Sequence, residues 1–261
     1  MGKVYLVGAG PGDADLITVK GLKCIQQADV ILYDRLINTE LLEQAKEDVE
    51  LIYCGKLPNH HALQQDTINH FLVKHARKGK VVTRLKGGDP FVYGRGGEEA
   101  EALAKNCVDF EVVPGITSGI AAPAYAGIPV THRELGSTFA FVTGHQKEGE
   151  EEELRWESLA KGIDTLAIYM GVKNLPYIVD QLTKYGRSFS TPVALIHWGT
   201  THEQKVTTGT LATIAEDAER DEVKNPSMII VGEVVRFRES ISWYEKLLEE
   251  QNEQVVAANV N

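Results

Sequence analysis

Short hydrophobic runs recur along the chain, and each of them ends at glycine, proline or a charged residue. Between these runs, segments such as 62–78 repeat apolar residues every three or four positions, which is the spacing of an amphipathic helix. Strands that alternate with helices predict a parallel sheet with helices on both faces. In the first half the predicted strands are 3–7, 30–33, 51–54, 81–85 and 110–113, and the predicted helices include 62–78 and 98–105.

The second half repeats this pattern with a different sequence. A segment of small residues, which Thr117 or Ser118 can cap, predicts a helix at the passage between the halves. The 261 residues are enough for two domains that each bury a core. We therefore predict two α/β domains, at 1–114 and 115–248, and a polar tail at 249–261 that is expected to fray. The predicted strands of the second half are 139–142, 166–169, 193–196 and 228–231.

The loop after the first strand is rich in glycine but poorly suited to a phosphate. Its sequence runs from Gly8 to Asp13, and a dinucleotide fingerprint would need its third glycine where Asp13 stands. A carboxylate there would face the pyrophosphate, and Pro11 removes a backbone N–H that such a loop would offer. The loop therefore favours a neutral or cationic nucleoside ligand.

A second glycine loop follows the strand 81–85. Gly87 and Gly88 have no Cβ, so a ligand can approach their backbone closely. Asp89 then stands where a ribose or a cationic group could be held. The alternative is a tight strand-to-helix turn in which Asp89 is a cap. In parallel sheets, ligands bind beyond the carboxyl ends of the strands, and Asp34 and Lys56 follow strands in the same way.

Charge and composition narrow the possible partners. The formal net charge of −10 leaves no general basic face for nucleic acid, so an anionic ligand would need a local cluster of Lys and Arg. No apolar run approaches the ~18 residues that cross a bilayer. The chain enters its first strand at Lys3, which leaves no room for a signal peptide. We therefore expect a cytoplasmic protein without a membrane partner.

Neither cysteine nor histidine spacing predicts a metal site. The three cysteines are far apart in the sequence, which fits a reducing compartment and argues against zinc or a disulfide framework. The histidine pairs lack neighbouring ligands at zinc spacing, so we expect no metal. These histidines are His60, His61, His197 and His202.

The ordered series of motifs resembles the tetrapyrrole methylases. The motifs are Val7 to Asp13, Tyr33 to Leu36, Arg84 to Pro90 and Val113 to Ser118, and the resemblance covers about residues 3 to 240. It implies two α/β domains of the tetrapyrrole methylase type, with S-adenosyl-L-methionine in the cleft between them. It also implies a homodimer.

The resemblance also implies the residues of the site. Asp34 and Lys56 match the proposed acid–base pair, although Asp34 could instead form a salt bridge with Arg35 or Lys56, and Lys56 could be a solvated strand end. Basic residues at the strand ends, chiefly Arg35 and Lys86, would bind substrate carboxylates, whereas Arg84 could pair inside the fold. The implied cofactor contacts are Pro11, Gly87, Gly88, Asp89, Val92, Thr117, Ser118, Met170 and Gly199.

The implied reaction moves a methyl group from the sulfonium to C2 and then C7 of uroporphyrinogen III, a small-molecule tetrapyrrole. The products would be precorrin-2 and S-adenosyl-L-homocysteine, and the pyrrole carbon would be the nucleophile, so no metal is needed. A later precorrin C-methyltransferase is the alternative. A nicotinamide-dependent oxidoreductase is disfavoured by Pro11 and Asp13, and a non-catalytic binding module by the presence of Asp34 and Lys56.

Overall fold

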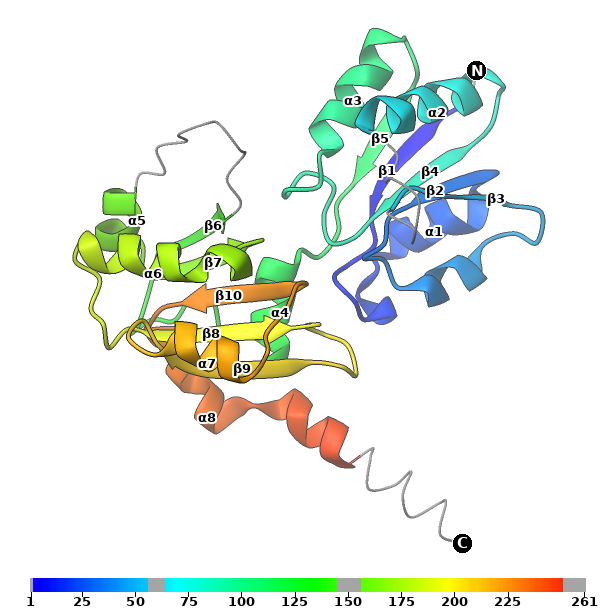
Figure 1. Ribbon diagram of the computed structural model, residues 1–261. Helices are drawn as coiled ribbons and strands as arrows, with labels where there is room; N and C mark the ends of the chain where they lie inside the picture. Colours follow the sequence, from blue (N-terminus) through cyan, green and yellow to red (C-terminus); the bar gives the residue numbers. More distant parts are fainter. Residues whose placement is uncertain (1, 56–63, 145–155, 251–261) are drawn as a thin grey trace, which may run out of the picture. The chain divides into compact units, whose positions relative to one another are not determined.

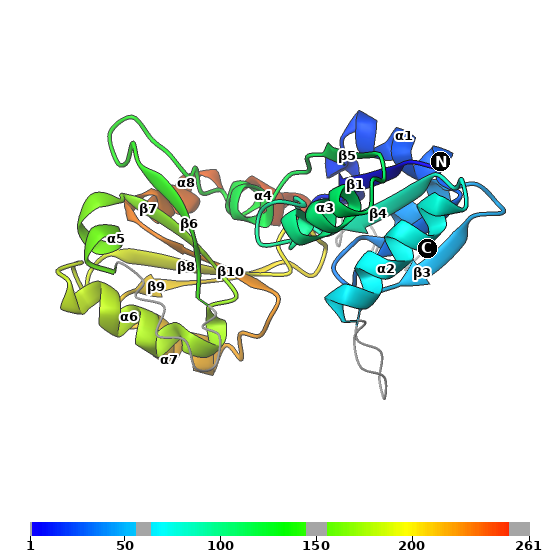
Figure 2. The same cartoon turned by 90° about the horizontal axis from the view of Figure 1, so that it is seen from above.

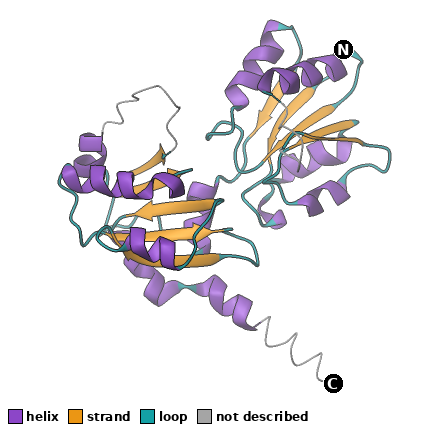
Figure 3. Ribbon diagram, in the orientation of Figure 1, coloured by secondary structure: helices purple, strands orange, loops and turns teal. Residues whose placement is uncertain are grey.

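The computed structural model describes residues 2–55, 64–144 and 156–250 and divides into two compact units (Figure 1). The units are Met1–Thr117 and Ser118–Asn261. The predicted boundary after residue 114 falls just before this division, in the loop between β5 (Phe110–Val113) and α4 (Ser118–Tyr125). Each unit holds one five-stranded sheet with helices packed against it (Figure 3).

The sheet of the first unit is wholly parallel, as predicted. Its strand order is β3-β2-β4-β1-β5, and every neighbouring pair is parallel. The strands are β1 (Val4–Gly8), β2 (Val30–Tyr33), β3 (Glu50–Tyr53), β4 (Val82–Lys86) and β5 (Phe110–Val113).

Helices cover both faces of this first sheet because successive side chains of each strand point to opposite faces. Val4 and Leu6 of β1 pack against α2 (Gln65–Arg77) and α3 (Gly96–Lys105) on one face. Val7 packs against α1 (Val19–Gln27) and η2 (Thr39–Gln44) on the other face. Figure 2 shows α1 and α2 on opposite sides of the sheet. The first face holds α2 (Gln65–Arg77) and α3 (Gly96–Lys105), and the second holds α1 (Val19–Gln27) and η2 (Thr39–Gln44), while η1 (Ala14–Leu16) lies in the Gly8 loop.

The second unit has a mixed sheet, which corrects the expectation that it repeats the first. Its order is β6-β7-β10-β8-β9, with β10 antiparallel to both β7 and β8 and β9 antiparallel to β8. Only β6 and β7 form a parallel neighbouring pair. The strands are β6 (Phe139–Thr143), β7 (Thr165–Tyr169), β8 (Pro192–His197), β9 (Lys205–Thr210) and β10 (Ser227–Val231).

Helices cover both faces of the mixed sheet as well. One face packs on α5, α6 and α7 through a core that includes Leu166 and Ile168 of β7. On the other face, the N–H of Gly119 in α4 donates to the hydroxyl of Tyr169 at 2.8 Å. The helices are α4 (Ser118–Tyr125), α5 (Trp156–Gly162), α6 (Leu175–Lys184), α7 (Ile214–Arg220) and α8 (Arg238–Ile241), with η3 (Val172–Asn174), η4 (Glu233–Phe237) and a last helix at 243–250.

Strand direction decides which loops share an edge of each sheet. All five strands of the first unit end at one edge, where the loops after Gly8, Tyr33 and Lys86 emerge. In the second unit, β7 and β8 are both antiparallel to β10, so they run the same way and end together with β6. The antiparallel β10 therefore ends at the opposite edge. No helix within residues 2–55, 64–144 and 156–250 has the length and apolar character needed to span a membrane.

Candidate active site at the strand ends

Three glycine loops of the first unit meet in direct backbone contact. A Cβ added to Gly8 would lie 2.5 Å from the Cα of Gly115 and 2.6 Å from the carbonyl oxygen of Gly88. The N–H of Gly88 donates to the carbonyl oxygen of Gly10 at 2.7 Å, and the N–H of Gly10 donates back at 3.3 Å. Gly88 has a φ of 68°, which favours glycine. The strand ends therefore present backbone rather than side chains.

The side chain of Asp89 links two of these loops. Its Oδ1 accepts from the N–H of Phe91 at 2.8 Å, and its Oδ2 accepts from the N–H of Gly115 at 3.0 Å. Asp89 therefore caps its own turn, as the structural alternative predicted. Each carboxylate oxygen has a second lone pair, so Asp89 retains the capacity to accept from a ribose hydroxyl or to face a cation.

The second unit places Ser118, Met170 and Gly199 near the start of α4 and the ends of β7 and β8. A Cβ on Gly199 would lie 2.6 Å from the Cβ of Ala122, so glycine allows the end of β8 to pack on α4. Met170 has a φ of 56° and is 45% exposed. A bulky side chain in the left-handed region is a backbone outlier, and such strain clusters at ligand sites.

The chemistry of these positions fits a nucleoside that carries a sulfonium. The six candidate cofactor residues of the first unit include no Lys, Arg or His, and Asp89 supplies a carboxylate. These six positions therefore offer no cationic side chain to a phosphate, whereas the Asp89 carboxylate can accept from hydroxyls and face a positive charge. The residues are Pro11, Gly87, Gly88, Asp89, Val92 and Thr117.

Behind this edge lies a cluster of four charged side chains, which we call the Asp34 network: Asp34, Arg84, Lys86 and Glu99. Arg84 and Lys86 are two residues apart on β4 and so point to the same face, where α3 supplies Glu99 in its first turn. Arg84 Nη2 donates to Asp34 Oδ1 at 2.6 Å, and its Nε donates to Glu99 Oε1 at 3.0 Å. Lys86 Nζ donates to Glu99 Oε1 at 2.9 Å and lies 3.8 Å from Asp34 Oδ2.

The Asp34 network reaches solvent through Asp34. The side chain of Asp34 is 32% exposed, whereas those of Arg84, Lys86 and Glu99 are 2%, 3% and 0% exposed. Burial lowers the pKa of Lys86, and the neighbouring charge of Arg84 adds to this effect. Burial opposes the charge of Arg84 too, but Glu99 and Asp34 outweigh it and raise the pKa of Arg84. Asp34 therefore faces solvent with a permanent cation directly behind it.

The structure brings some of the predicted site residues into contact and places others differently. Asp34 is paired with Arg84 and not with the exposed Arg35, and the prediction that Arg84 could pair inside the fold is confirmed. Lys86, predicted to bind a substrate carboxylate, is buried, and its Nζ lies 2.9 Å from Glu99 Oε1. Lys56 lies outside the described residues.

Sequence reasoning missed Glu99 as a partner of these cations. The run Glu98-Glu99 indicated only an acidic helix start, and both residues look alike in the sequence. The helical phase separates them, since Glu99 is buried while Glu98 pairs with the exposed Arg95. Oε2 of Glu99 is buried without a hydrogen-bond partner.

The histidines form no metal cluster in the part of the chain that the structure describes. Nδ1 of His197 lies 3.0 Å from the carbonyl oxygen of Pro226 and 3.1 Å from the hydroxyl of Ser227. No group of three or more His, Cys, Asp or Glu side chains among the described residues could hold a metal ion. His60 and His61 lie outside these residues.

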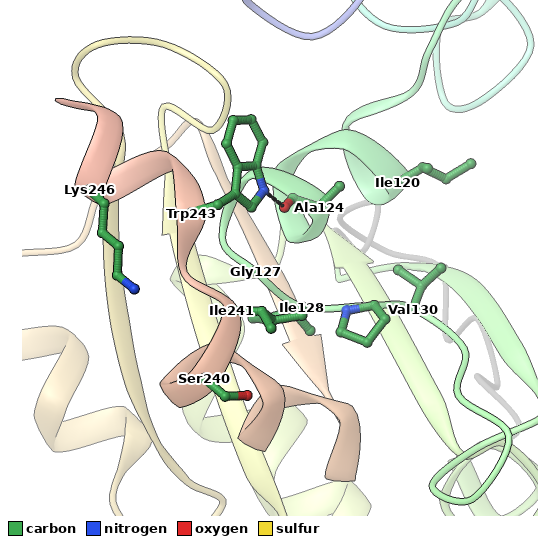
Figure 4. Close-up of a pocket in the computed structure, with 10 residues that line it drawn as sticks. Ile120, Ala124, Gly127, Ile128, Val130, Ser240, Ile241, Trp243 and Lys246 are labelled. Carbon is green, nitrogen blue, oxygen red and sulfur yellow. Dashed lines mark hydrogen bonds between the residues drawn. The ribbon is translucent and has the colours of Figure 1, made fainter. Parts of the chain in front are cut away.

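An apolar groove of about 650 Å³ lies elsewhere on the second unit, beside α4 and residues 240–246 (Figure 4). Nε1 of Trp243 donates to the carbonyl oxygen of Ala124 at 2.9 Å at its edge. Lys246 is the one charged residue of its lining, so the groove offers little to a polycarboxylate. The lining is Ile120, Ala124, Gly127, Ile128, Pro129, Val130, Ser240, Ile241, Trp243 and Lys246.

Comparisons with known proteins agree on one family. The model of the Tetrapyrrole (Corrin/Porphyrin) Methylases matches residues 3–215. The chain is 70% identical over 237 residues to the uroporphyrinogen-III C-methyltransferase of Priestia megaterium, which covers 91% of this chain and 100% of that protein.

Two solved structures extend this agreement to the fold. The uroporphyrin-III C-methyl transferase of Thermus thermophilus, complexed with S-adenyl homocysteine, has a TM-score of 0.77 and 39% identity, covering 90% of this chain and 94% of that one. Cobalt precorrin-4 methyltransferase, a cobalamin biosynthetic enzyme, has a TM-score of 0.80 and 31% identity, covering 89% and 95%. These matches confirm the predicted α/β class.

Proposed function

Because this chain belongs to the tetrapyrrole (corrin/porphyrin) methylase family, we propose that it methylates uroporphyrinogen III at C2 and C7 to give precorrin-2. The observation that carries this proposal is the 70% identity to a uroporphyrinogen-III C-methyltransferase along that protein's whole length. The methyl donor is S-adenosyl-L-methionine, and S-adenosyl-L-homocysteine is released. This donor carries no phosphate, which suits the glycine-lined strand ends of the first unit, where the candidate cofactor residues include no Lys, Arg or His.

The chain's contribution to catalysis is alignment and control of charge. S-adenosyl-L-methionine supplies an electrophilic methyl group on a sulfonium. The interlocked loops of Gly8, Gly88 and Gly115 hold a fixed surface against which a ligand can lie close to the backbone. Fixing the reacting carbon and the methyl group in line is worth a large part of a methyl-transfer barrier.

Asp34 is the group that we propose to act on the substrate. Its carboxylate is the solvent-facing member of the Asp34 network and stands at the carboxyl end of β2. Placed near the attacked pyrrole, a carboxylate stabilises the positive charge that develops there and accepts the proton that the ring must lose. Lys56 is proposed as the proton donor or as a ligand of an acetate or propionate arm.

The substrate carries eight carboxylates, which need cations near the site. Arg35 is exposed directly after Asp34, and a guanidinium can bind a carboxylate through two parallel hydrogen bonds. We propose that Arg35 makes such a contact. The buried Lys86 acts differently, by adding positive charge behind Asp34.

A later precorrin C-methyltransferase is the second candidate, since cobalt precorrin-4 methyltransferase shares the fold. Its 31% identity to this chain is far below the 70% of the uroporphyrinogen enzyme. Incubation with uroporphyrinogen III and labelled S-adenosyl-L-methionine, followed by mass spectrometry, separates the two. A gain of two methyl groups is expected, and an unmethylated tetrapyrrole would exclude the proposal.

We also propose a homodimer that works in the cytoplasm. Cys24, Cys54 and Cys107 are free thiols, which suits a reducing compartment. Burial raises the pKa of the Cys54 thiol to about 11, so it remains protonated and unreactive at neutral pH. Light scattering after size exclusion should give twice the mass of the chain, and the mass of one chain would contradict the dimer.

A further inference from the structure

The Asp34 network is more elaborate than a simple salt bridge. Arg84 is fixed on both sides, because Nη2 contacts Asp34 and Nε contacts Glu99. Its Nη1 also donates at 3.4 Å to the carbonyl oxygens of Leu32 and Leu85. The guanidinium therefore has one orientation, and the Asp34 carboxylate that it holds inherits that orientation. Charge-assisted pairs of this kind are short and directional.

Stability alone is a weak reason to keep such a network. Burying two cations and a carboxylate carries a large desolvation cost, and well-packed apolar residues often replace buried ion pairs without loss of stability. In the Asp34 network the buried charged side chains also differ in whether they contact Asp34. Arg84 contacts the Asp34 carboxylate directly, whereas Glu99 contacts both cations and makes no direct contact with Asp34. The arrangement thus places the Arg84 cation between the Asp34 carboxylate and the buried Glu99 carboxylate.

We propose that Arg84 is a positioning residue that keeps Asp34 ionised and aimed at the substrate, and that Glu99 tunes the strength of this effect. The inference rests on the proposed function, in which Asp34 acts on the macrocycle. Beyond that function, it assigns to Arg84 and Glu99 the electrostatic control of the Asp34 carboxylate. The other cation near Asp34 is Lys86, whose Nζ lies 3.8 Å from Asp34 Oδ2 but is held by Glu99 at 2.9 Å. Cys54 stays a neutral thiol, and Gln65, which donates to Glu99 at 3.3 Å, carries no charge.

Two charge-removing substitutions should move the acidic limb of the kcat/KM profile in opposite directions. Arg84→Gln removes the cation that contacts Asp34 Oδ1 at 2.6 Å, so the acidic limb of the kcat/KM profile should move to higher pH by about one unit or more. Glu99→Gln removes the anion behind Arg84, so the cation acts on Asp34 with less compensation. The acidic limb should then move to lower pH.

The experiment measures kcat/KM against pH for the full chain with uroporphyrinogen III. Arg84→Lys retains the charge but cannot reach both carboxylates, so its acidic limb should stay near that of the wild type while kcat falls. Arg220→Gln is the matched control, because Arg220 lies 2.6 Å from Asp217 and 2.9 Å from Asp221 on the exposed surface. Its profile should coincide with that of the wild type.

Shifts in the same direction, or no shift in either variant, would overturn the inference. If Arg84→Gln fails to fold, the sign of the Glu99→Gln shift decides alone. A ¹³C NMR titration of the Asp34 carboxyl in the ligand-free protein, assigned with Asp34→Asn, should show the same opposite shifts. If the wild type leaves uroporphyrinogen III unmethylated, the proposed function fails, and the NMR titration still decides whether Arg84 and Glu99 control Asp34.

Discussion

At the scale of single residues, Asp34 is the position on which the proposed chemistry depends. It stands at the end of β2, half-buried, with its Oδ1 on Arg84 and its surface open to solvent. A carboxylate paired only with surface cations would be screened and weakly oriented. The buried partner makes Asp34 a fixed charge, which is the property that an electrostatic catalyst requires.

Replacing this carboxylate should separate binding from turnover. Asp34→Asn keeps the shape but removes the charge and the proton acceptor, so kcat should fall about 10²- to 10⁴-fold. Calorimetry should show S-adenosyl-L-homocysteine binding within a factor of about three of the wild type, since its proposed contacts lie on other residues. Turnover close to that of the wild type would remove Asp34 from the chemistry.

At the scale of elements, the loop after β1 depends on the smallness of Gly8. An added methyl group at Gly8 would meet backbone atoms of Gly88 and Gly115, which cannot move aside as a flexible side chain can. Because these loops carry the proposed cofactor contacts, a change in their packing should also change cofactor binding.

Gly8→Ala should therefore destabilise the fold and weaken cofactor binding together. Overpacking of this kind costs about 1–3 kcal/mol. Gly162→Ala, at the end of α5 with nothing within 4 Å of the added Cβ, is the control and should be neutral or slightly stabilising. Chemical denaturation and binding of S-adenosyl-L-homocysteine measure both effects, and equal behaviour of the two variants would contradict this account.

Another element-scale contact ties the starts of β2 and β4 together through Asp29. Its Oδ2 accepts from the N–H of Val81 at 2.8 Å, and its Oδ1 accepts from Lys46. The N–H of Val81, then Lys46, lowers the pKa of Asp29 below its ordinary value. The stabilisation is therefore complete above the unfolded-state pKa of about 4 and is lost as the pH falls below it. Denaturation of Asp29→Asn should show lower stability at pH 7 and a difference that shrinks towards pH 3.

At the scale of the whole molecule, the sequence was sufficient for the fold class and for the first sheet. The run 30–33 is continuous and apolar, as a buried parallel strand requires, and β4 is buried as well although Thr83 and Arg84 interrupt its apolar pattern. The second sheet was harder, because a hydrophobic run such as 228–231 carries no information on strand direction. The sequence analysis did not predict β9, because Lys205–Thr210 is a polar edge strand without a hydrophobic run.

The same distinction holds for the site. Glycine loops and strand-end carboxylates are visible in the sequence, so Gly88, Asp89 and Asp34 could be named in advance. The ion pair between Arg84 and Glu99 could not be predicted from the sequence. The two residues are fifteen positions apart and come into contact only when α3 packs on β4. For the same reason the sequence alone predicts Lys86 as a substrate ligand, whereas the structure buries it against Glu99.

The net charge of the molecule also sets its response to salt. The chain carries −10 overall and its substrate is a polyanion, so productive binding must rely on local cations such as Arg35. Raising the ionic strength from about 0.05 to 0.5 M shortens the screening length several-fold and should raise the KM for uroporphyrinogen III. The kcat should change little, and a KM that does not respond to salt would exclude a basic lining.

The central claim is that the glycine-lined strand ends of the first unit seat the methyl donor. A crystal structure with S-adenosyl-L-homocysteine tests this most directly. We predict that the nucleoside and its methionine portion lie against Pro11, Gly88 and Asp89, with the sulfur directed towards the side on which Asp34 opens to solvent. A ligand bound away from Pro11 and Gly88 would contradict the account.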